Sequence, residues 1–134
     1  MRLTRLFSAV EATAHCDLPC GVYDPAQARI EAESVKAIQE KYQASDDDVF
    51  KMRCVLIKEQ RAELVKHHLW VLWTDYFKPP HFEKYPELHE LFNKATKQAG
   101  ASGAKQSVDP AEGQKLLDYI ADIDKVFWET KAAA

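Results

Sequence analysis

The sequence is short of the features that mark several classes of protein. Its 134 residues include only four glycines and three cysteines, which excludes a collagen-like repeat and a disulfide-dense scaffold. No apolar run approaches the roughly 18 residues that a membrane span needs. The net charge is −3, so the basic excess typical of a nucleic-acid binder is also missing. What is present, 46% hydrophobic and 29% charged residues, indicates one globular domain.

Residues 1–14 differ in composition from the rest of the chain. They lack proline and glycine, carry two arginines and one acid, and end in Ala-Thr-Ala. Small residues in this arrangement suit a peptidase, while the apolar stretch is shorter than the roughly 7–15 residues of a secretory signal. We therefore predict a propeptide that is removed after Ala14, leaving a domain of residues 15–134. A short native helix is the alternative.

Helical periodicity dominates the chain after a proline- and glycine-containing segment at 15–25. Asp-Pro pairs at 24–25 and 109–110 each place a capping residue before a proline that suits the first helical position. We predict helices over 26–42 and 49–76, then from Pro86 through Ala95 and from Pro110 through Phe127, with a proline-bracketed loop between the second and third. With no convincing strand, these elements predict an all-α fold, an antiparallel up-down four-helix bundle.

One apolar stripe of the second predicted helix indicates the face that should be buried. Its members recur at steps of three and four, which places them on one side of a helix. Cys54 belongs to the stripe, so we expect a small buried thiol at this position. The full stripe is Phe50, Cys54, Ile57, Arg61, Leu64, His68 and Leu72.

The remaining two cysteines, Cys16 and Cys20, lie together in the segment 15–25. A local disulfide, or two idle thiols, is the plain interpretation. A closed zinc site is disfavoured because no second ligand pair completes the four ligands that it needs.

Removal of residues 1–14 would change the chemistry of this segment, because His15 would gain a free amine. That amine, the backbone nitrogen and thiolate of Cys16 and the thiolate of Cys20 form a planar set of two nitrogens and two sulfurs. The imidazole of His15 is available from above. Such a donor set indicates Ni(II) or Cu(II).

The segment His-Cys-Asp-Leu-Pro-Cys-Gly-Val-Tyr-Asp-Pro at 15–25 resembles the N-terminal metal-binding hook of the nickel superoxide dismutase family. The resemblance continues at 57–63, 75–86, 117–120 and 127–129, and so spans the chain after residue 14. It implies an enzyme that converts superoxide to oxygen and hydrogen peroxide by cycling Ni(III) and Ni(II). It also implies one nickel ion per subunit and a homohexamer.

The resemblance also implies roles for individual residues of the hook and of its surroundings. The nickel ligands would be His15, Cys16 and Cys20. Tyr23 and Tyr76 would lie beside the open face of the metal, with packing at the edge of the core as the alternative for both.

Four charged residues complete the expected site. Lys78 would provide positive potential for an anionic substrate, or would be an ordinary surface lysine. Asp17 would orient the hook backbone. Glu31 and Arg61 both fall on apolar helix faces, where unpaired charges are costly. They would form a structural ion pair, a network that orients the imidazole of His15, or both.

Two other functions stay open on the sequence alone. One is a metal-binding or metal-sensing module that uses the same hook without redox chemistry. The other is a helical interaction protein with a Cys16–Cys20 disulfide and no metal. The expected partners are superoxide, further copies of the chain and a processing peptidase, without nucleic acid or membrane. The missing export signal favours a cytoplasmic location.

Overall fold

The fold is known from a computed structural model, which describes residues 21–134. Its elements are all helical and no strand occurs within this range. None of the helices described there is both long enough and apolar enough to cross a bilayer. In chain order the elements are α1 (Ala26–Gln43), α2 (Asp48–Val71), the π-helical turn η1 (Leu72–Tyr76), α3 (Pro79–Lys84), α4 (Leu88–Ala99) and α5 (Pro110–Ala132).

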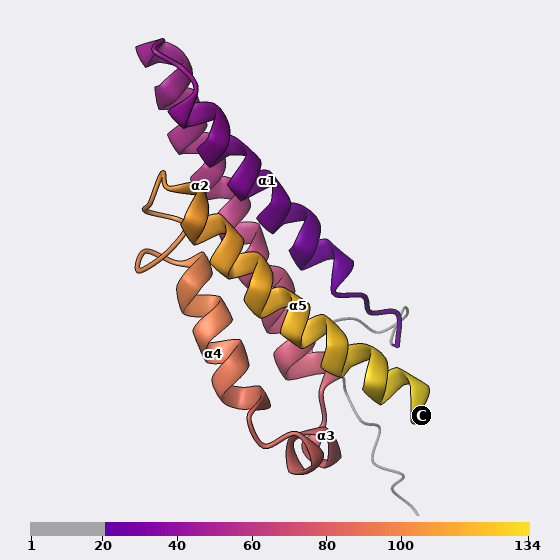
Figure 1. The fold of residues 1–134 in the computed structure, drawn as a ribbon. Coiled ribbons are helices and arrows are strands. Elements are labelled where there is room, and N and C mark those ends of the chain that lie inside the picture. Colours follow the sequence, from indigo (N-terminus) through magenta and orange to yellow (C-terminus); the bar gives the residue numbers. More distant parts are fainter. Residues whose placement is uncertain (1–20) are drawn as a thin grey trace, which may run out of the picture.

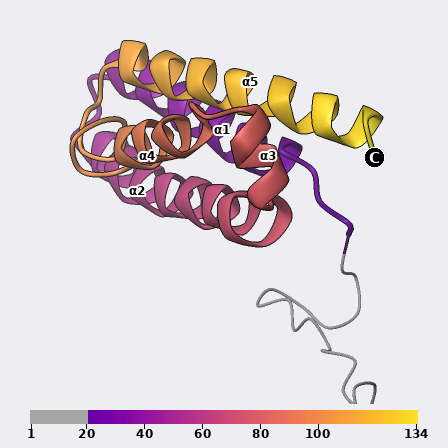
Figure 2. The ribbon, with the colours of Figure 1, turned by 90° about the horizontal axis from the view of Figure 1, so that it is seen from below.

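Four of these helices form the predicted antiparallel bundle (Figure 1). Extensive packing of α1 on α2, α2 on α4, α4 on α5 and α5 on α1 closes a ring around one core. Both ribbon views place the start of α1, the end of α2, the short α3 and the end of α5 together (Figures 1 and 2). We call this the α3 end of the bundle. It is also where the chain enters at residues 21–25.

Local capping explains where the long helices begin. The side chain of Asp24 accepts a hydrogen bond from the N–H of Ala26 at 2.8 Å, and that of Asp109 accepts one from Ala111 at 2.9 Å. Asp47 accepts from the N–H groups of Val49 and Phe50 at the start of α2. These contacts satisfy amide donors that the first turn of a helix leaves unpaired. The two predicted Asp-Pro starts are confirmed.

The proline-bracketed loop predicted after the second helix is wrong in part, because it contains α3. Pro79 and Pro80 occupy the first turn of α3, where a missing N–H costs nothing and the fixed φ suits the helix. The N–H of Lys78 donates to Nδ1 of His81 at 3.0 Å, which closes this turn. The same prolines therefore end one helix and begin the next.

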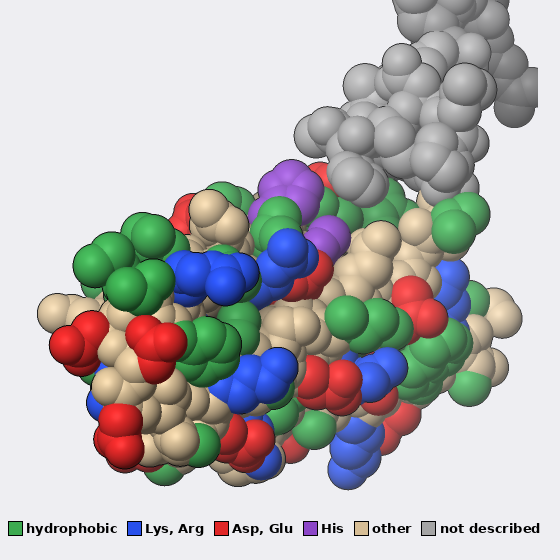
Figure 3. Space-filling view, turned by 90° about the horizontal axis from the view of Figure 1, so that it is seen from above, with side chains coloured by type: hydrophobic (Ala, Val, Ile, Leu, Met, Phe, Trp, Pro, Cys, Tyr) green, Lys and Arg blue, Asp and Glu red, His purple; other side chains and the backbone are tan. Residues whose placement is uncertain are grey.

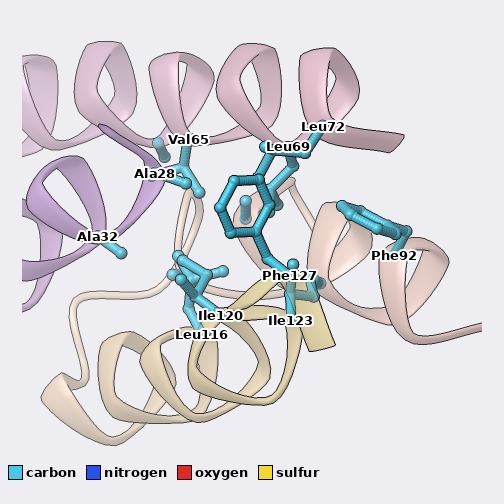
Figure 4. Packing of buried hydrophobic residues seen from close by; sticks show 14 of the residues in the cluster. Ala28, Ala32, Val65, Leu69, Leu72, Phe92, Leu116, Ile120, Ile123 and Phe127 are labelled. Atoms are coloured by element: carbon cyan, nitrogen blue, oxygen red, sulfur yellow. The ribbon is translucent and has the colours of Figure 1, made fainter. Parts of the chain in front are cut away.

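The core lies between the four long helices (Figure 4), where Phe127 of α5 reaches toward Leu69 of α2 and Leu72 of η1. The predicted stripe of the second helix is wrong in part: Cys54 and Leu72 are buried as expected, but the larger residues between and before them are not. Its members Phe50, Ile57 and Leu64 remain 37–38% exposed. The buried face of α2 is instead formed by Cys54, Lys58, Ala62, Val65 and Leu69.

The two faces of α2 share Cys54, and the expectation of a buried free thiol there is confirmed. Because the side chain of Ala62 on the inner face is small, the neighbouring helices can pack closely against α2 there. The larger residues Phe50, Ile57 and Leu64 therefore lie at the surface.

One lysine is part of this interior. Lys58 is 1% exposed, and its Nζ donates to the carbonyl of Ala104 at 3.2 Å and to that of Lys105. Gln39 from α1 donates to Ala104 at 3.3 Å and to Ser107 at 3.0 Å. These donors hold the connection between α4 and α5, whose backbone carbonyls would otherwise be buried without partners.

The predicted helix 49–76 does not keep α-helical geometry to its end. From Leu72 to Tyr76 the turn is π-helical, and the N–H of Phe77 donates to the carbonyl of Leu72 at 3.0 Å. A π turn accommodates one more residue than an α turn, so it changes the direction of the side chains that follow. Tyr76 thereby packs against Phe127 of α5, with ring centroids 4.4 Å apart.

Candidate metal centre

The predicted ligands His15, Cys16 and Cys20, together with Asp17, lie outside the described residues. Within 21–134, no group of three or more His, Cys, Asp or Glu side chains could hold a metal ion. The described part of the chain therefore contributes the surroundings of the predicted centre. These surroundings fall into an aromatic cluster at the α3 end and an ion pair between α1 and α2.

Tyr23 and Tyr76 lie together in the aromatic cluster. Their ring centroids are 5.6 Å apart with an interplanar angle of 57°. Tyr76 also contacts Phe77 at 4.9 Å and stacks on the imidazole of His81 at 5.8 Å. Two residues from distant parts of the sequence are thus neighbours at the α3 end, where residues 21–25 lead into α1.

Thr130 on α5 fixes the hydroxyl of Tyr76. Their oxygens are 2.7 Å apart, and the hydroxyl of Thr130 donates to the carbonyl of Phe127, also at 2.7 Å. Because a threonine has one hydroxyl proton, Tyr76 is the donor in the bond to Thr130. The oxygen of Tyr76 therefore keeps its acceptor capacity toward the other side. Thr130 was missed by sequence reasoning, although it continues the buried face of α5 three residues after Phe127.

Two lysines bring positive charge to this end of the bundle. Lys78 is exposed and immediately precedes α3. Lys131 was not predicted as a site residue; its Nζ lies 5.4 Å from the ring centroid of Tyr76 and 5.7 Å from that of Phe127. It also donates to the carbonyl of Gly21 at 3.3 Å. No sequence signal near Lys131 indicates this contact, because the contact depends on how the bundle closes.

The imidazole of His81 is held in its neutral form. Burial is the main cause that lowers the pKa of His81, and the charge of Lys78 lowers it further. Since Nδ1 accepts the N–H of Lys78, the ring proton of neutral His81 is on Nε2.

Glu31 and Arg61 form the ion pair that their positions in the sequence suggested. Nη1 of Arg61 lies 3.3 and 3.2 Å from the two carboxylate oxygens of Glu31 and so joins α1 to α2. The side chain of Glu31 is 17% exposed and that of Arg61 is 42% exposed, so the pair reaches the surface.

His68 is a neighbour of this pair on α2. Burial is the main cause that lowers its pKa, followed by the charge of His67; the charge of Glu31 acts in the opposite direction. Figure 3 shows a face of the bundle on which histidine side chains gather beside basic and acidic ones.

Comparison with known proteins gives a close match along the chain. A family model described as nickel-containing superoxide dismutase matches residues 10–131. Two curated relatives described as superoxide dismutase (Ni), from Streptomyces seoulensis and Streptomyces coelicolor, are 72% and 70% identical over 98% of this chain and 99% of their own. One solved structure is described as Ni-containing superoxide dismutase with Ni ligation corresponding to the oxidized state. It is 74% identical, covers 88% of this chain and 99% of its own, and has a TM-score of 0.83.

Solved variants of nickel superoxide dismutase carry a replacement at the first residue, a histidine, at the third, an aspartate, or at the ninth, a tyrosine. Their TM-scores with this chain are 0.79, 0.82 and 0.84 at 71–72% identity. When positions in the present chain are counted from His15, Asp17 is third and Tyr23 is ninth.

Proposed function

Because this chain belongs to the nickel-containing superoxide dismutase family, which makes it an oxidoreductase with a nickel cofactor, we propose that it dismutates superoxide at an N-terminal hook. Two superoxide anions and two protons give one oxygen molecule and one hydrogen peroxide. One superoxide loses the electron that the other gains. Nickel, when bound, supplies the Ni(III)/Ni(II) couple that carries this electron.

The ligands that we assign are the amine and imidazole of His15, the backbone nitrogen and thiolate of Cys16, and the thiolate of Cys20. The donor set fits nickel, since thiolates and a deprotonated amide nitrogen are electron-rich and stabilise the higher oxidation state. The spacing of His15, Asp17 and Tyr23 carries the assignment, because it reproduces the first, third and ninth positions of the solved variants.

This assignment requires that residues 1–14 are removed as a propeptide by a processing peptidase. With those residues attached, the nitrogen of His15 is an amide and the amine ligand is lost. The lengths of the relatives support removal. The curated relatives align with 98% of this chain. The solved chains align over 99% of their own length but cover only 82–88% of this chain, so they are shorter. The functional domain would then be residues 15–134, with the hook at 15–25.

The residues around the hook have separate tasks in this proposal. Tyr23 and Tyr76 allow only small molecules to reach the metal. The hydroxyl of Tyr76 donates its proton to Thr130, so its oxygen accepts a hydrogen bond from water. Lys78 attracts the anionic substrate, an effect that raises association rates. Asp17 orients the hook backbone.

Glu31 and Arg61 are assigned to the imidazole of His15. A metal-bound imidazole donates its other N–H to a carboxylate or carbonyl, and such a partner fixes the orientation of the ring. The carboxylate of Glu31 is held in place by Arg61 at 3.2 Å and so is suited to this task.

We further propose a cytoplasmic homohexamer. The exposed apolar residues of α2 support association between copies, because Phe50, Ile57 and Leu64 line one stripe and Trp70 lies near its end, 41% exposed. Sedimentation of the chain that begins at His15 tests the number of subunits.

The test of the function compares the chain of residues 15–134 with the uncut chain. We expect the shorter chain to bind one nickel ion per subunit, to give the electron spin resonance signal of Ni(III) and to consume superoxide. Cys20→Ser should lose all three properties, while Cys54→Ala, which changes a buried thiol outside the hook, is the matched control and should keep them. Equal nickel binding and activity of the uncut chain would contradict the proposal. A nickel-free chain with no free thiol at 16 and 20 would instead support the disulfide-containing interaction protein.

A further inference from the structure

We infer that Lys131, on the last turn of α5, is a positioning residue that fastens the base of the hook to the bundle. The inference rests on the proposed function, since the hook is the proposed nickel ligand set. Nζ of Lys131 donates to the carbonyl of Gly21 at 3.3 Å. Gly21 directly follows Cys20, so this hydrogen bond holds the carbonyl of the residue next to a proposed ligand.

The ammonium of Lys131 is directed to that carbonyl by an aromatic platform. It lies over the rings of Tyr76 and Phe127, at 5.4 and 5.7 Å from their centroids. A cation over a ring face is attracted by the electrons of the ring. Tyr76 is itself fixed by its hydrogen bond to the buried hydroxyl of Thr130. Within residues 21–134 the structure records no carboxylate in an ion pair with Lys131, so the rings and the carbonyl determine its place.

Residues 21–23 contact this platform at two points. The carbonyl of Gly21 binds Lys131, and the ring of Tyr23 packs on that of Tyr76 at 5.6 Å. The chain reaches the first of these contacts through Gly21, whose φ of +96° is in the left-handed region.

A segment attached at two neighbouring points has few orientations. It therefore loses less conformational entropy when the residues before it bind a metal. Loss of the Lys131 contact should thus weaken nickel binding without changing the ligand set.

The experiment uses the chain that begins at His15 and measures nickel affinity by competition with a chelator. Lys131→Met keeps the apolar stem over the rings and removes the ammonium. Lys131→Arg restores a cation and a donor. Lys115→Met removes the same charge from an exposed position in the first half of α5 and is the matched control.

We expect about a tenfold loss of nickel affinity in Lys131→Met, the size that follows from one charged hydrogen bond and one cation–ring contact. Lys131→Arg should recover most of it and Lys115→Met should lose none. The Ni(III) resonance should broaden in Lys131→Met alone, because a looser hook samples more ligand geometries.

Equal nickel affinity of Lys131→Met and Lys115→Met would overturn the inference and leave the proposed function intact, since both would still bind. Failure of Lys131→Arg to recover affinity would overturn it as well. Absence of nickel binding by the unsubstituted trimmed chain would refute the proposed function itself. Should Lys131→Met not fold, Lys131→Gln takes its place, and its nickel affinity and Ni(III) resonance are measured in the same way.

Discussion

The buried ammonium of Lys58 offers the sharpest test of how the connection between α4 and α5 is held. Lys58→Met keeps a side chain of similar length in the core and removes only the charged donor. The carbonyl of Ala104 retains its hydrogen bond from Gln39 at 3.3 Å, whereas that of Lys105 has no other donor among residues 21–134. One partly buried acceptor thus loses its protein partner.

The expected cost follows from that count. An unpaired buried acceptor costs about 1–3 kcal/mol, and the carbonyl of Lys105 is only partly buried, so we expect the free energy of unfolding at pH 7 to fall by about 1 kcal/mol. In urea this corresponds to a midpoint lower by about 0.5 M. Lys58→Ala should lose roughly a further 2 kcal/mol, because it also removes the buried stem and leaves a cavity. The exposed Lys115→Met is the control and should change stability by less than about 0.5 kcal/mol.

The pH dependence gives a second reading of the same variant. Burial lowers the pKa of Lys58 from its ordinary 10.5, against a smaller opposite effect of Glu59. The unfolded chain therefore binds this proton more tightly than the folded one, and the free energy of unfolding should rise as the pH approaches 10.5. Lys58→Met lacks this rise, so its deficit should widen as the pH increases toward 10.5. A variant as stable as the original chain at pH 7 would refute the reasoning. It would mean that the cost of burying the charge exceeds the gain from its hydrogen bonds.

Two further predictions concern the α3 end and the histidines whose pKa is lowered by burial. Gly21→Ala should weaken nickel binding by about tenfold in the chelator assay, because alanine at positive φ costs about 1–2 kcal/mol, while no atom of the described residues 21–134 lies within 4 Å of the added methyl group. Unchanged affinity would show that the turn is not needed. Burial lowers the pKa of both His68 and His81 from 6.5, so the folded chain binds fewer protons than the unfolded chain and its stability should decline as the pH falls below 6.5. Urea unfolding from pH 8 to pH 5 should show a shallower decline for His81→Gln than for the original chain, and identical slopes would contradict this assignment.

The parts of the fold that the sequence predicts well are those decided locally. The Asp-Pro starts of α1 and α5 depend on residues within one turn, and a bundle follows from helical periodicity with short connections. The prolines before α3 were misinterpreted because the same residue can end a helix or occupy its first turn. In the structure they do both, and the hydrogen bond from the N–H of Lys78 to Nδ1 of His81 closes the first turn of α3.

The buried face of α2 could not be chosen from the sequence, because the helix carries two neighbouring apolar strips. The strip with larger residues, Phe50, Ile57 and Leu64, was predicted to be inside. The structure buries the strip with Ala62 and Val65 instead. Helical periodicity shows that a strip is apolar, but not whether the same chain or another copy covers it.

Of the predicted site residues that the structure describes, Glu31 and Arg61 form a pair, and Tyr23 lies on Tyr76. Their roles toward nickel stay predictions, as do those of Asp17 and Lys78. Thr130 and Lys131 escaped sequence reasoning because their importance arises from the closing of the bundle. This closing brings the end of α5 to the segment before α1, and no local sequence pattern indicates that contact.

The contact between Lys131 and Gly21 joins positions that are 110 residues apart, and this has a consequence for the order of folding. Contacts within and between successive helices close short loops and form early, while a contact across most of the chain must wait for them. The support beneath the hook is therefore absent from any partly folded chain. Partly folded chains should hold the metal weakly, so tight capture of nickel should follow folding of the bundle instead of guiding it.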